Sequence, residues 1–263
     1  MTRRLRLDAE LVRRGLAASR SAARVAIEKG LVTVKGVPLA RAATLVAGDT
    51  PIALAEQPSR FVSRGGEKLD GALERLSIDV PGRWLDAGAS TGGFTDCLLQ
   101  RGAAEVIAID VGYGQLDWTL RNDPRVTVLE RTNVRHLTPD DVPWVPDGVV
   151  ADLSFISLRI VLPALVEVAS PDATFVLLVK PQFEVGKSSV GKGGVVRDPE
   201  LWRSAVGDVV AGAAELGLGT FGVTYSDPPG PSGNREFFVA ARLGATEDLS
   251  GLDEAIGASA AGI

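Results

Sequence analysis

The chain has one cysteine and one histidine, Cys97 and His136. A single cysteine excludes a disulfide within the chain, and one residue of each kind cannot supply the Cys and His ligands of a zinc cage. Any Ser-His-Asp relay would have to use His136. The sequence also lacks a run of 18 apolar residues that could span a membrane and an N-terminal apolar segment of signal-peptide length. We therefore expect a cytoplasmic protein without a metal site or a membrane partner.

Positive charge is unevenly distributed along the sequence. Residues 1–48 hold ten basic and three acidic side chains, a net charge of +7, so that the overall charge of −5 leaves −12 on the remainder. A basic end on an acidic body is typical of a protein that binds nucleic acid or another anionic surface through one end only. A solvated basic face without a partner is the alternative.

The basic end has its own pattern of short elements. Residues 8–17 and 19–30 show the apolar spacing of two helices, the second of which begins at a Ser cap and ends at Gly30. Strand patterns follow in LVTVKGVPL and, as a strand pair around Gly48 and Asp49, in TLVAGDTPIAL. Two basic helices before a small sheet resemble the RNA-binding module first known from a ribosomal small-subunit protein. We expect this domain at residues 1–58 and a linker at 59–64.

Residues 65–245 alternate between helix and strand patterns, as α/β proteins do. We expect a helix at about 65–77 and buried strands that end near Asp86, Asp110, Leu129, Asp152 and Lys180. Two further strands, GTFGVTYS and REFFVAARL, are joined by a segment too short for a helical crossover, so they should pair antiparallel. The sheet is therefore expected to be parallel with a reversed hairpin at one edge, and residues 246–263 to form a loose polar tail.

A glycine-rich loop, DAGASTGGF, follows the first of these strands. Gly88, Gly92 and Gly93 allow a tight turn into a helix N-terminus, which suits an anionic or strongly polar ligand. The spacing D-x-G-x-x-x-G-G differs from the G-x-G-x-x-G of dinucleotide-binding proteins. Asp86 can meet a methionyl ammonium but would repel a pyrophosphate, and Asp110 is placed to bind ribose hydroxyls. The loop thus favours S-adenosylmethionine over NAD, with a tight turn lined by solvated carboxylates as the plain alternative.

Four charged residues fall at strand ends or on a neighbouring helix of the predicted sheet: Lys68, Asp152, Lys180 and Glu236. Open α/β sheets bind ligands at the carboxyl ends of their parallel strands. Each residue has an ordinary alternative, a lysine that reaches water or a surface acid. Together with the glycine-rich loop, however, the four resemble the Lys-Asp-Lys-Glu tetrad of ribose 2′-O-methyltransferases of the FtsJ-like type.

A resemblance to one family extends in order over nearly the whole chain. Its motifs are RGLAASR, VSRGGEKLDGAL, LDAGASTGGFT, DVGYGQL, LRNDPRV, LERTN, ADLSFISL, LVKPQFEVG, GGVV and PGPSGN, which look like those of the TlyA family. Its members are bacterial ribosomal RNA methyltransferases that use S-adenosylmethionine to methylate the 2′-hydroxyl of cytidine, and some are also called haemolysins. The resemblance implies a Rossmann-like class I methyltransferase sheet preceded by a small α+β RNA-binding domain. The long N-terminal arm is similar to that of members acting on both ribosomal subunits.

The resemblance also implies the residues of the sites. Catalysis falls to the tetrad. The residues that would bind S-adenosylmethionine are Asp86, Gly88, Ala89, Ser90, Thr91, Gly92, Gly93, Phe94, Asp110, Val111, Asn133, Asp152 and Phe155. Those that would bind ribosomal RNA are Arg3, Arg4, Arg6, Arg14, Arg20, Arg24 and Lys35. Phe155 could pack on the adenosyl moiety, on the target base or in the protein core. We expect a monomer.

The linker departs from the family pattern. The best-studied relatives carry a tryptophan-containing stretch there, whereas this chain has PSRFVSRGGEKL, with Phe61 as its only aromatic residue. The linker between the expected RNA-binding and cofactor-binding parts therefore differs from that of these relatives.

The chemistry requires alignment of the ribose oxygen with the sulfonium methyl and removal of one proton. We expect Lys180 to be the general base, its pKa lowered by burial and by repulsion from Lys68, with Asp152 and Glu236 orienting the lysines and the ribose. The basic end would contact RNA phosphates and 2′-hydroxyls, and the cytidine would be splayed out. Three alternatives are a membrane-active haemolysin, a non-catalytic RNA-binding protein and an NAD oxidoreductase.

Overall fold

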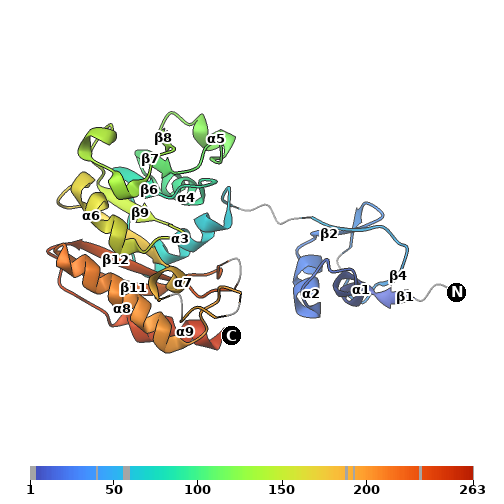
Figure 1. Ribbon diagram of the computed structural model, residues 1–263. Helices are drawn as coiled ribbons and strands as arrows, with labels where there is room; N and C mark the ends of the chain where they lie inside the picture. Colours follow the sequence, from blue (N-terminus) through green and yellow to red (C-terminus); the bar gives the residue numbers. More distant parts are fainter. Residues whose placement is uncertain are drawn as a thin grey trace. The chain divides into compact units, whose positions relative to one another are not determined.

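The computed structural model describes residues 4–39, 41–55, 60–186, 189–191, 193–230 and 233–262. The chain divides into two compact units, Met1–Ser59 and Arg60–Ile263 (Figure 1). Arg3, which the sequence predicts to bind RNA, lies outside the described residues.

In its described residues, 4–39 and 41–55, the small unit has two helices and two small antiparallel sheets. Its core is formed by the apolar residues Leu7, Leu11, Ala23, Ile27, Val32 and Val46, all of them buried. In chain order its elements are β1 (Arg4–Arg6), α1 (Leu7–Arg13), α2 (Arg20–Glu28), β2 (Val32–Val34), β3 (Val37–Pro38), β4 (Leu45–Ala47) and β5 (Ile52–Leu54). Ser19 caps α2 by accepting the N–H of Ala22, as the sequence predicted.

The strand pair predicted around Gly48 and Asp49 was wrong in its pairing. β4 pairs with β1, and β5 pairs with β2, which also carries β3. The two strands separate where the Arg14 guanidinium donates to the carbonyl oxygens of Gly48 and Thr50, at 3.0 and 2.8 Å. β1 was not predicted because three residues, two of them arginine, carry no clear strand pattern.

The larger unit is built on one seven-stranded sheet, in the order β11-β12-β10-β9-β6-β7-β8. Among the strands of this sheet that the structure describes, β12 alone runs opposite to the others, and it pairs antiparallel with β10 and β11. The predicted α/β sheet with an antiparallel terminal hairpin is therefore confirmed. The strands are β6 (Arg83–Ala87), β7 (Glu105–Asp110), β8 (Val126–Glu130), β9 (Gly148–Ala151), β10 (Thr174–Val179), β11 (Leu218–Tyr225) and β12 (Phe237–Leu243).

Helices cover both faces of this sheet (Figure 1). Side chains of successive strand residues point to opposite faces, so Trp84 enters one core and Leu85 the other. The Trp84 core includes residues of α3 (Arg64–Arg75), α4 (Gly93–Gln100) and α5 (Trp118–Arg121). The Leu85 core includes residues of α6 (Leu158–Val168), α8 (Pro199–Glu215) and α9 (Gly251–Ala261). Short helical turns complete the unit: η1 (Val134–His136), η2 (Pro139–Asp141) and α7 (Pro181–Glu184).

The last part of the predicted linker is packed onto the larger unit. Phe61 is buried, and a Cβ placed on Gly66 would lie 2.3 Å from its ring. The N–H of Val62 donates to the carboxylate of Asp96 at 2.8 Å, and Ser63 caps α3 by accepting the N–H of Gly65. Arg60–Arg64 therefore belongs structurally to the larger unit, which begins earlier than residue 65.

The C-terminal residues do not form the loose tail expected after residue 245. The N–H of Asp248 donates to the carbonyl oxygen of Thr220 at 2.7 Å, which ties the segment to β11. α9 then buries Ala255 and Ile256 in the core. Four charged residues between 246 and 254 make the segment polar overall, but the small apolar face of α9 is enough to dock it.

Candidate active site

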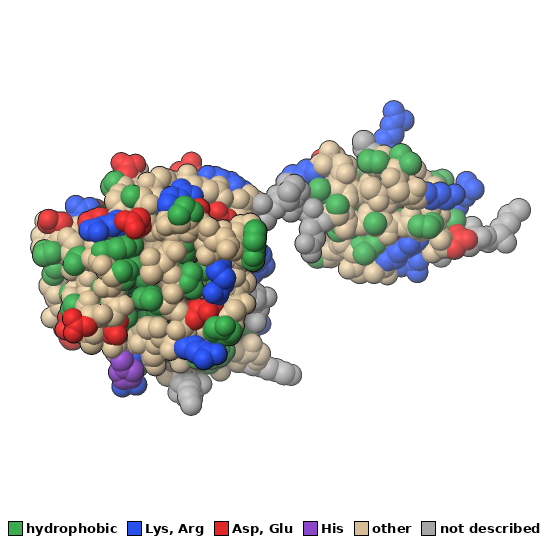
Figure 2. Space-filling view, turned by 90° about the horizontal axis from the view of Figure 1, so that it is seen from above, with side chains coloured by type: hydrophobic (Ala, Val, Ile, Leu, Met, Phe, Trp, Pro, Cys, Tyr) green, Lys and Arg blue, Asp and Glu red, His purple; other side chains and the backbone are tan. Residues whose placement is uncertain are grey.

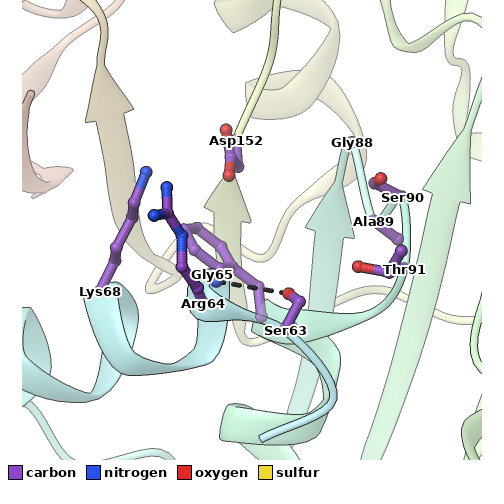
Figure 3. Close-up of a pocket in the computed structure, with 11 residues that line it drawn as sticks. Ser63, Arg64, Gly65, Lys68, Gly88, Ala89, Ser90, Thr91 and Asp152 are labelled. Carbon is purple, nitrogen blue, oxygen red and sulfur yellow. Dashed lines mark hydrogen bonds between the residues drawn. The ribbon is translucent and has the colours of Figure 1, made fainter. Parts of the chain in front are cut away.

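The sheet order reverses between β6 and β9, and open α/β sheets bind ligands at such a point, beyond the carboxyl ends of the strands. Two adjoining pockets of about 300 and about 350 Å³ lie here and share Gly88, Ser90 and Asp152. In the first, the side chains of Arg64 and Lys68 point from α3 toward the strand end that carries Asp152, and the loop from Gly88 to Thr91 borders the opposite side (Figure 3).

The loop after β6 needs glycine for close packing. Gly88 has a φ of +89°, and a Cβ there would lie 2.4 Å from the carbonyl oxygen of Asp152. A Cβ on Gly93, the first residue of α4, would lie 2.2 Å from the Ser63 hydroxyl oxygen. Larger side chains would therefore separate this loop from the loop after β9 and from α3. The residues predicted to bind the cofactor that line the first pocket are Gly88, Ala89, Ser90, Thr91, Gly93, Phe94 and Asp152.

The second pocket is formed around Asp110, at the end of β7. The Asp110 carboxylate accepts the N–H of Ser90 at 2.8 Å and that of Gly112 at 2.7 Å, which fixes its orientation. Each carboxylate oxygen has a second lone pair for a ligand hydroxyl. The predicted residues that line this pocket are Gly88, Ser90, Asp110, Val111, Asn133, Asp152 and Phe155.

Asp86 lies beneath the loop and, like Gly92, lines neither of these two pockets. Its side chain is fully buried and accepts the Thr95 hydroxyl at 2.7 Å. Burial raises the pKa of the Asp86 carboxyl to about 7, and the negative charges of Asp152 and Asp110 add to the effect, against the Thr95 hydrogen bond. Its Oδ1 has no hydrogen-bond partner within the described residues. A cationic donor entering beneath the loop would satisfy this oxygen and favour its ionised form.

The four tetrad residues come together as two pairs. Lys68, on α3, pairs with Glu236, before β12, with 2.6 Å between Nζ and Oε2, and both side chains are buried. Lys180, after β10, forms an ion pair with Asp152, after β9, and donates to the Ser154 hydroxyl at 3.1 Å. The Lys180 and Asp152 side chains remain partly exposed, at 12% and 24%. Each lysine thus has its own carboxylate; the sequence analysis expected the two acids to orient the lysines but did not assign the pairs.

The loop after β9 is held by residues of the VKPQFEVG motif. Glu184 accepts the Ser157 hydroxyl at 2.5 Å and the N–H of Leu158 at 2.9 Å, at the start of α6. Phe183 packs against Phe155, with 5.1 Å between ring centroids. Phe155 has a φ of +66° and is 91% exposed, which excludes the alternative that it is a core residue. The sequence analysis missed the role of Glu184, whose position one turn after Lys180 was the available signal.

The small unit displays basic side chains, as Figure 2 shows for one view of it. Arg6, Arg20 and Arg24 are about half exposed and all bond to Asp8. Arg14 is only 22% exposed, pairs with Glu10 and holds backbone carbonyls, so it stabilises the fold. Of the remaining predicted RNA contacts within the described residues, Arg4 and Lys35 line a groove of about 510 Å³.

Comparisons with known proteins identify the families to which the two units are similar. The model of the FtsJ-like methyltransferase family matches residues 61–243, and that of the S4 domain matches residues 5–50. The TlyA 16S/23S rRNA (cytidine-2′-O)-methyltransferase of Mycobacterium tuberculosis is 57% identical over 97% of each chain. The Bacillus subtilis protein YqxC, named as an rRNA methyltransferase, is 44% identical over 89% of this chain and 84% of its own.

A solved structure described as a hemolysin from Streptococcus thermophilus covers 98% of this chain and 96% of its own, with 34% identity and a TM-score of 0.75. Within the residues that the structure describes, no helix combines the length and apolarity needed to cross a membrane. The family match removes the NAD oxidoreductase alternative. The chain belongs to the FtsJ-like methyltransferase family and, within it, to the TlyA proteins that carry an N-terminal S4 domain.

Proposed function

We propose that this protein transfers a methyl group from S-adenosylmethionine to the ribose 2′-hydroxyl of a cytidine in ribosomal RNA. The observation that carries the proposal is the convergence of Lys68, Asp152, Lys180 and Glu236, from four separate segments, beside the glycine-rich loop. The TlyA relative at 57% identity is named for this reaction on both 16S and 23S rRNA. We extend both targets to this chain.

The two adjoining pockets fit S-adenosylmethionine. The buried, unpartnered Oδ1 of Asp86 suits its ammonium group, and the backbone of Gly88–Thr91 can line its methionyl part. Asp110 would accept the ribose hydroxyls, and Val111, Asn133 and Phe155 would surround the adenine in the second pocket. When bound, this cofactor supplies an activated methyl group on a sulfonium.

The lysine pairs would position the ribose and handle its proton. Asp152, which lines both pockets, and Ser154 fix Nζ of Lys180, and Lys180 would accept the proton of the 2′-hydroxyl after it has released one proton of its own to solvent. Lys68, held by its buried pair with Glu236, lines the same pocket as Asp152. Alignment of the hydroxyl oxygen would supply most of the rate, because a well-oriented reactant lowers the barrier by about 7–11 kcal/mol. Phe155 offers an exposed ring for the splayed-out cytosine as well as for the adenine.

The S4 domain would hold the ribosomal RNA through its phosphates and 2′-hydroxyls. Base edges in an RNA helix are poorly accessible to side chains, so this domain would contribute affinity more than sequence choice. The pocket around the tetrad would select the ribose that is methylated.

The test is to incubate the protein with methyl-labelled S-adenosylmethionine and with small subunits, large subunits and whole ribosomes from a strain that lacks the modification. Nuclease digestion and mass spectrometry would map the label. Label on a cytidine ribose in both isolated subunits supports the proposal. Label on large subunits alone removes the second target, and absence of label from all particles contradicts the reaction. Lysis of liposomes by the same preparation would instead favour the membrane activity that the name of the streptococcal protein suggests.

A further inference from the structure

Asp8, at the start of α1, collects three arginines from different places in the S4 domain. The Arg6 side chain, from β1, donates to both carboxylate oxygens, at 3.1 and 3.3 Å. Arg20, the first residue of α2, donates to Oδ2 at 3.0 Å, and Arg24, one turn later, donates to the same oxygen at 3.2 Å. One carboxylate thus fixes three guanidinium groups relative to one another.

The four side chains differ sharply in exposure. Asp8 is fully buried, whereas Arg6, Arg20 and Arg24 are 42%, 54% and 52% exposed. Burial alone would raise the pKa of the Asp8 carboxyl, but its hydrogen bonds with the three arginines together hold that pKa well below its usual range. Asp8 therefore stays ionised, and the cluster presents a net charge of +2 to the solvent.

The exposed guanidinium groups keep donors for a ligand. Arg20 and Arg24 each use one of their five N–H donors in a hydrogen bond to Asp8, and Arg6 uses two. Guanidinium donors match the oxygens of a phosphate in pairs. A free arginine loses rotamer freedom when it binds, and Asp8 has already restricted that freedom here.

We propose that Asp8 is a positioning residue for RNA binding, which presents Arg6, Arg20 and Arg24 as one preformed site for the phosphates of the RNA backbone. This inference rests on the proposed function for the identity of the ligand, ribosomal RNA. It adds a role for an acidic residue in a surface that binds an anion. Asp8 acts through the arginines and does not touch the RNA.

Glu10 provides a matched comparison, because it is another buried carboxylate of α1 that pairs with arginines. It bonds to Arg13 at 2.6 Å and to Arg14 at 2.8 Å. Arg14 in turn holds the carbonyls of Gly48 and Thr50, so this cluster braces the turn between β4 and β5. Its loss should affect the stability of the fold more than the phosphate-binding surface.

The charge change and the loss of the preformed site predict opposite changes in RNA affinity. Asp8→Asn removes one negative charge, and general electrostatic attraction alone would then strengthen RNA binding. Loss of the preformed site has the opposite effect. We expect Asp8→Asn to weaken RNA binding about tenfold and to lower the slope of log affinity against log salt by about one, as the loss of about one phosphate contact would. Glu10→Gln makes the same charge change without touching Arg6, Arg20 or Arg24, so it should bind RNA as tightly as the unchanged chain or more tightly, with no fall in the salt slope.

The experiment uses the full chain and deproteinised large-subunit ribosomal RNA, with filter binding measured at several salt concentrations. Thermal unfolding of each variant sets a temperature at which all of them are folded. Asp8→Glu, which restores a carboxylate, should recover part of the affinity. Equal or tighter binding by folded Asp8→Asn, with an unchanged salt slope, would overturn the inference.

Arg24→Gln covers the case in which Asp8→Asn does not fold, because Arg6 and Arg20 still pair with Asp8 in this variant. Its salt slope should fall by about one relative to the unchanged chain. An unchanged slope would overturn the inference. All these readouts are binding measurements, so absence of methyl transfer by a chain that binds RNA counts against the proposed reaction alone. Failure of the unchanged chain to bind RNA, with binding to phosphatidylserine vesicles instead, would overturn both.

Discussion

The S4 domain and the methyltransferase unit each combine carboxylates with basic side chains, but they bury different partners. In the S4 domain, Asp8 is buried under three half-exposed arginines, so positive charge is displayed to the solvent. In the larger unit, Lys68 and Glu236 are both buried, and Lys68 lines the first pocket. The exposed arginines around Asp8 can bind an extended anion, whereas the buried pair of Lys68 and Glu236 can fix one small group in place. Under the proposed function, this difference separates RNA affinity, in the S4 domain, from methyl transfer, in the larger unit.

The largest effect on stability should come from breaking the buried ion pair of Lys68 and Glu236. Lys68→Met leaves Glu236 buried without its partner, which should lower the free energy of unfolding by about 3–5 kcal/mol. The double variant Lys68→Met/Glu236→Leu should lose less, because no buried charge remains unpaired. Urea unfolding of the three chains measures both values. A double variant less stable than the single one would show that the pair itself stabilises the unit.

A smaller loss is expected when the loop that carries Asp152 and Phe155 is released. Glu184→Ala removes the acceptor for the Ser157 hydroxyl and leaves the N–H of Leu158 unsatisfied, at a cost of about 1–3 kcal/mol in the free energy of unfolding. Methyl transfer should fall with it, since the loop is no longer fixed. Glu184→Gln retains an acceptor and a donor and serves as the control. Full activity of Glu184→Ala would separate this loop from catalysis.

The pH dependence of stability should reveal Asp86. Its pKa is about 7 in the folded chain against an ordinary value of 3.8, so the folded chain keeps this proton while the unfolded chain releases it. The contribution of Asp86 to stability is therefore complete below about pH 4 and is lost as the pH rises to about 7. Asp86→Asn should flatten this part of the profile. Thermal unfolding between pH 4 and 8 checks the difference between the two chains, and parallel profiles would contradict the assignment.

The smallest effect should come from an exposed pair. Arg203 and Asp253 join α8 to α9 at 2.7 Å, with side chains 40% and 83% exposed. Arg203→Gln should change the free energy of unfolding by about 0–1 kcal/mol, because water and salt screen such pairs. Unfolding at low and high salt gives the measurement. A loss as large as that of Lys68→Met would mean that burial does not separate the two kinds of pair.

Local sequence patterns predicted much of this fold. The strand ends at Asp86, Asp110, Asp152 and Lys180 follow buried apolar runs that only a sheet covered on both faces can use. Gly88 and Gly93 were predicted to allow a tight turn, and the structure shows that a Cβ at either position would clash. The tetrad required the family resemblance, since each lysine or acid alone has an ordinary explanation.

Other features depend on contacts distant in sequence and left no local signal. Within the tetrad, Lys68 and Glu236 are 168 residues apart in the sequence. The separation of β4 from β5 depends on Arg14, and the burial of Phe61 depends on the space above Gly66. The docking of α9 likewise depends on the shape of the surface it covers. In the sequence, Asp8 is one acid among many basic residues. Its role becomes visible only in the fold, which brings Arg6, Arg20 and Arg24 around it.

The most direct test of the division between binding and chemistry is single-turnover methyl transfer by Lys180→Met, with S-adenosylmethionine affinity and RNA affinity measured on the same preparation. Ser154→Ala, which removes only the hydroxyl beside Nζ, is the matched control and should lose less activity. We predict that Lys180→Met lowers the transfer rate by about 10²- to 10⁴-fold while both affinities remain unchanged. Normal transfer by this variant would contradict the account.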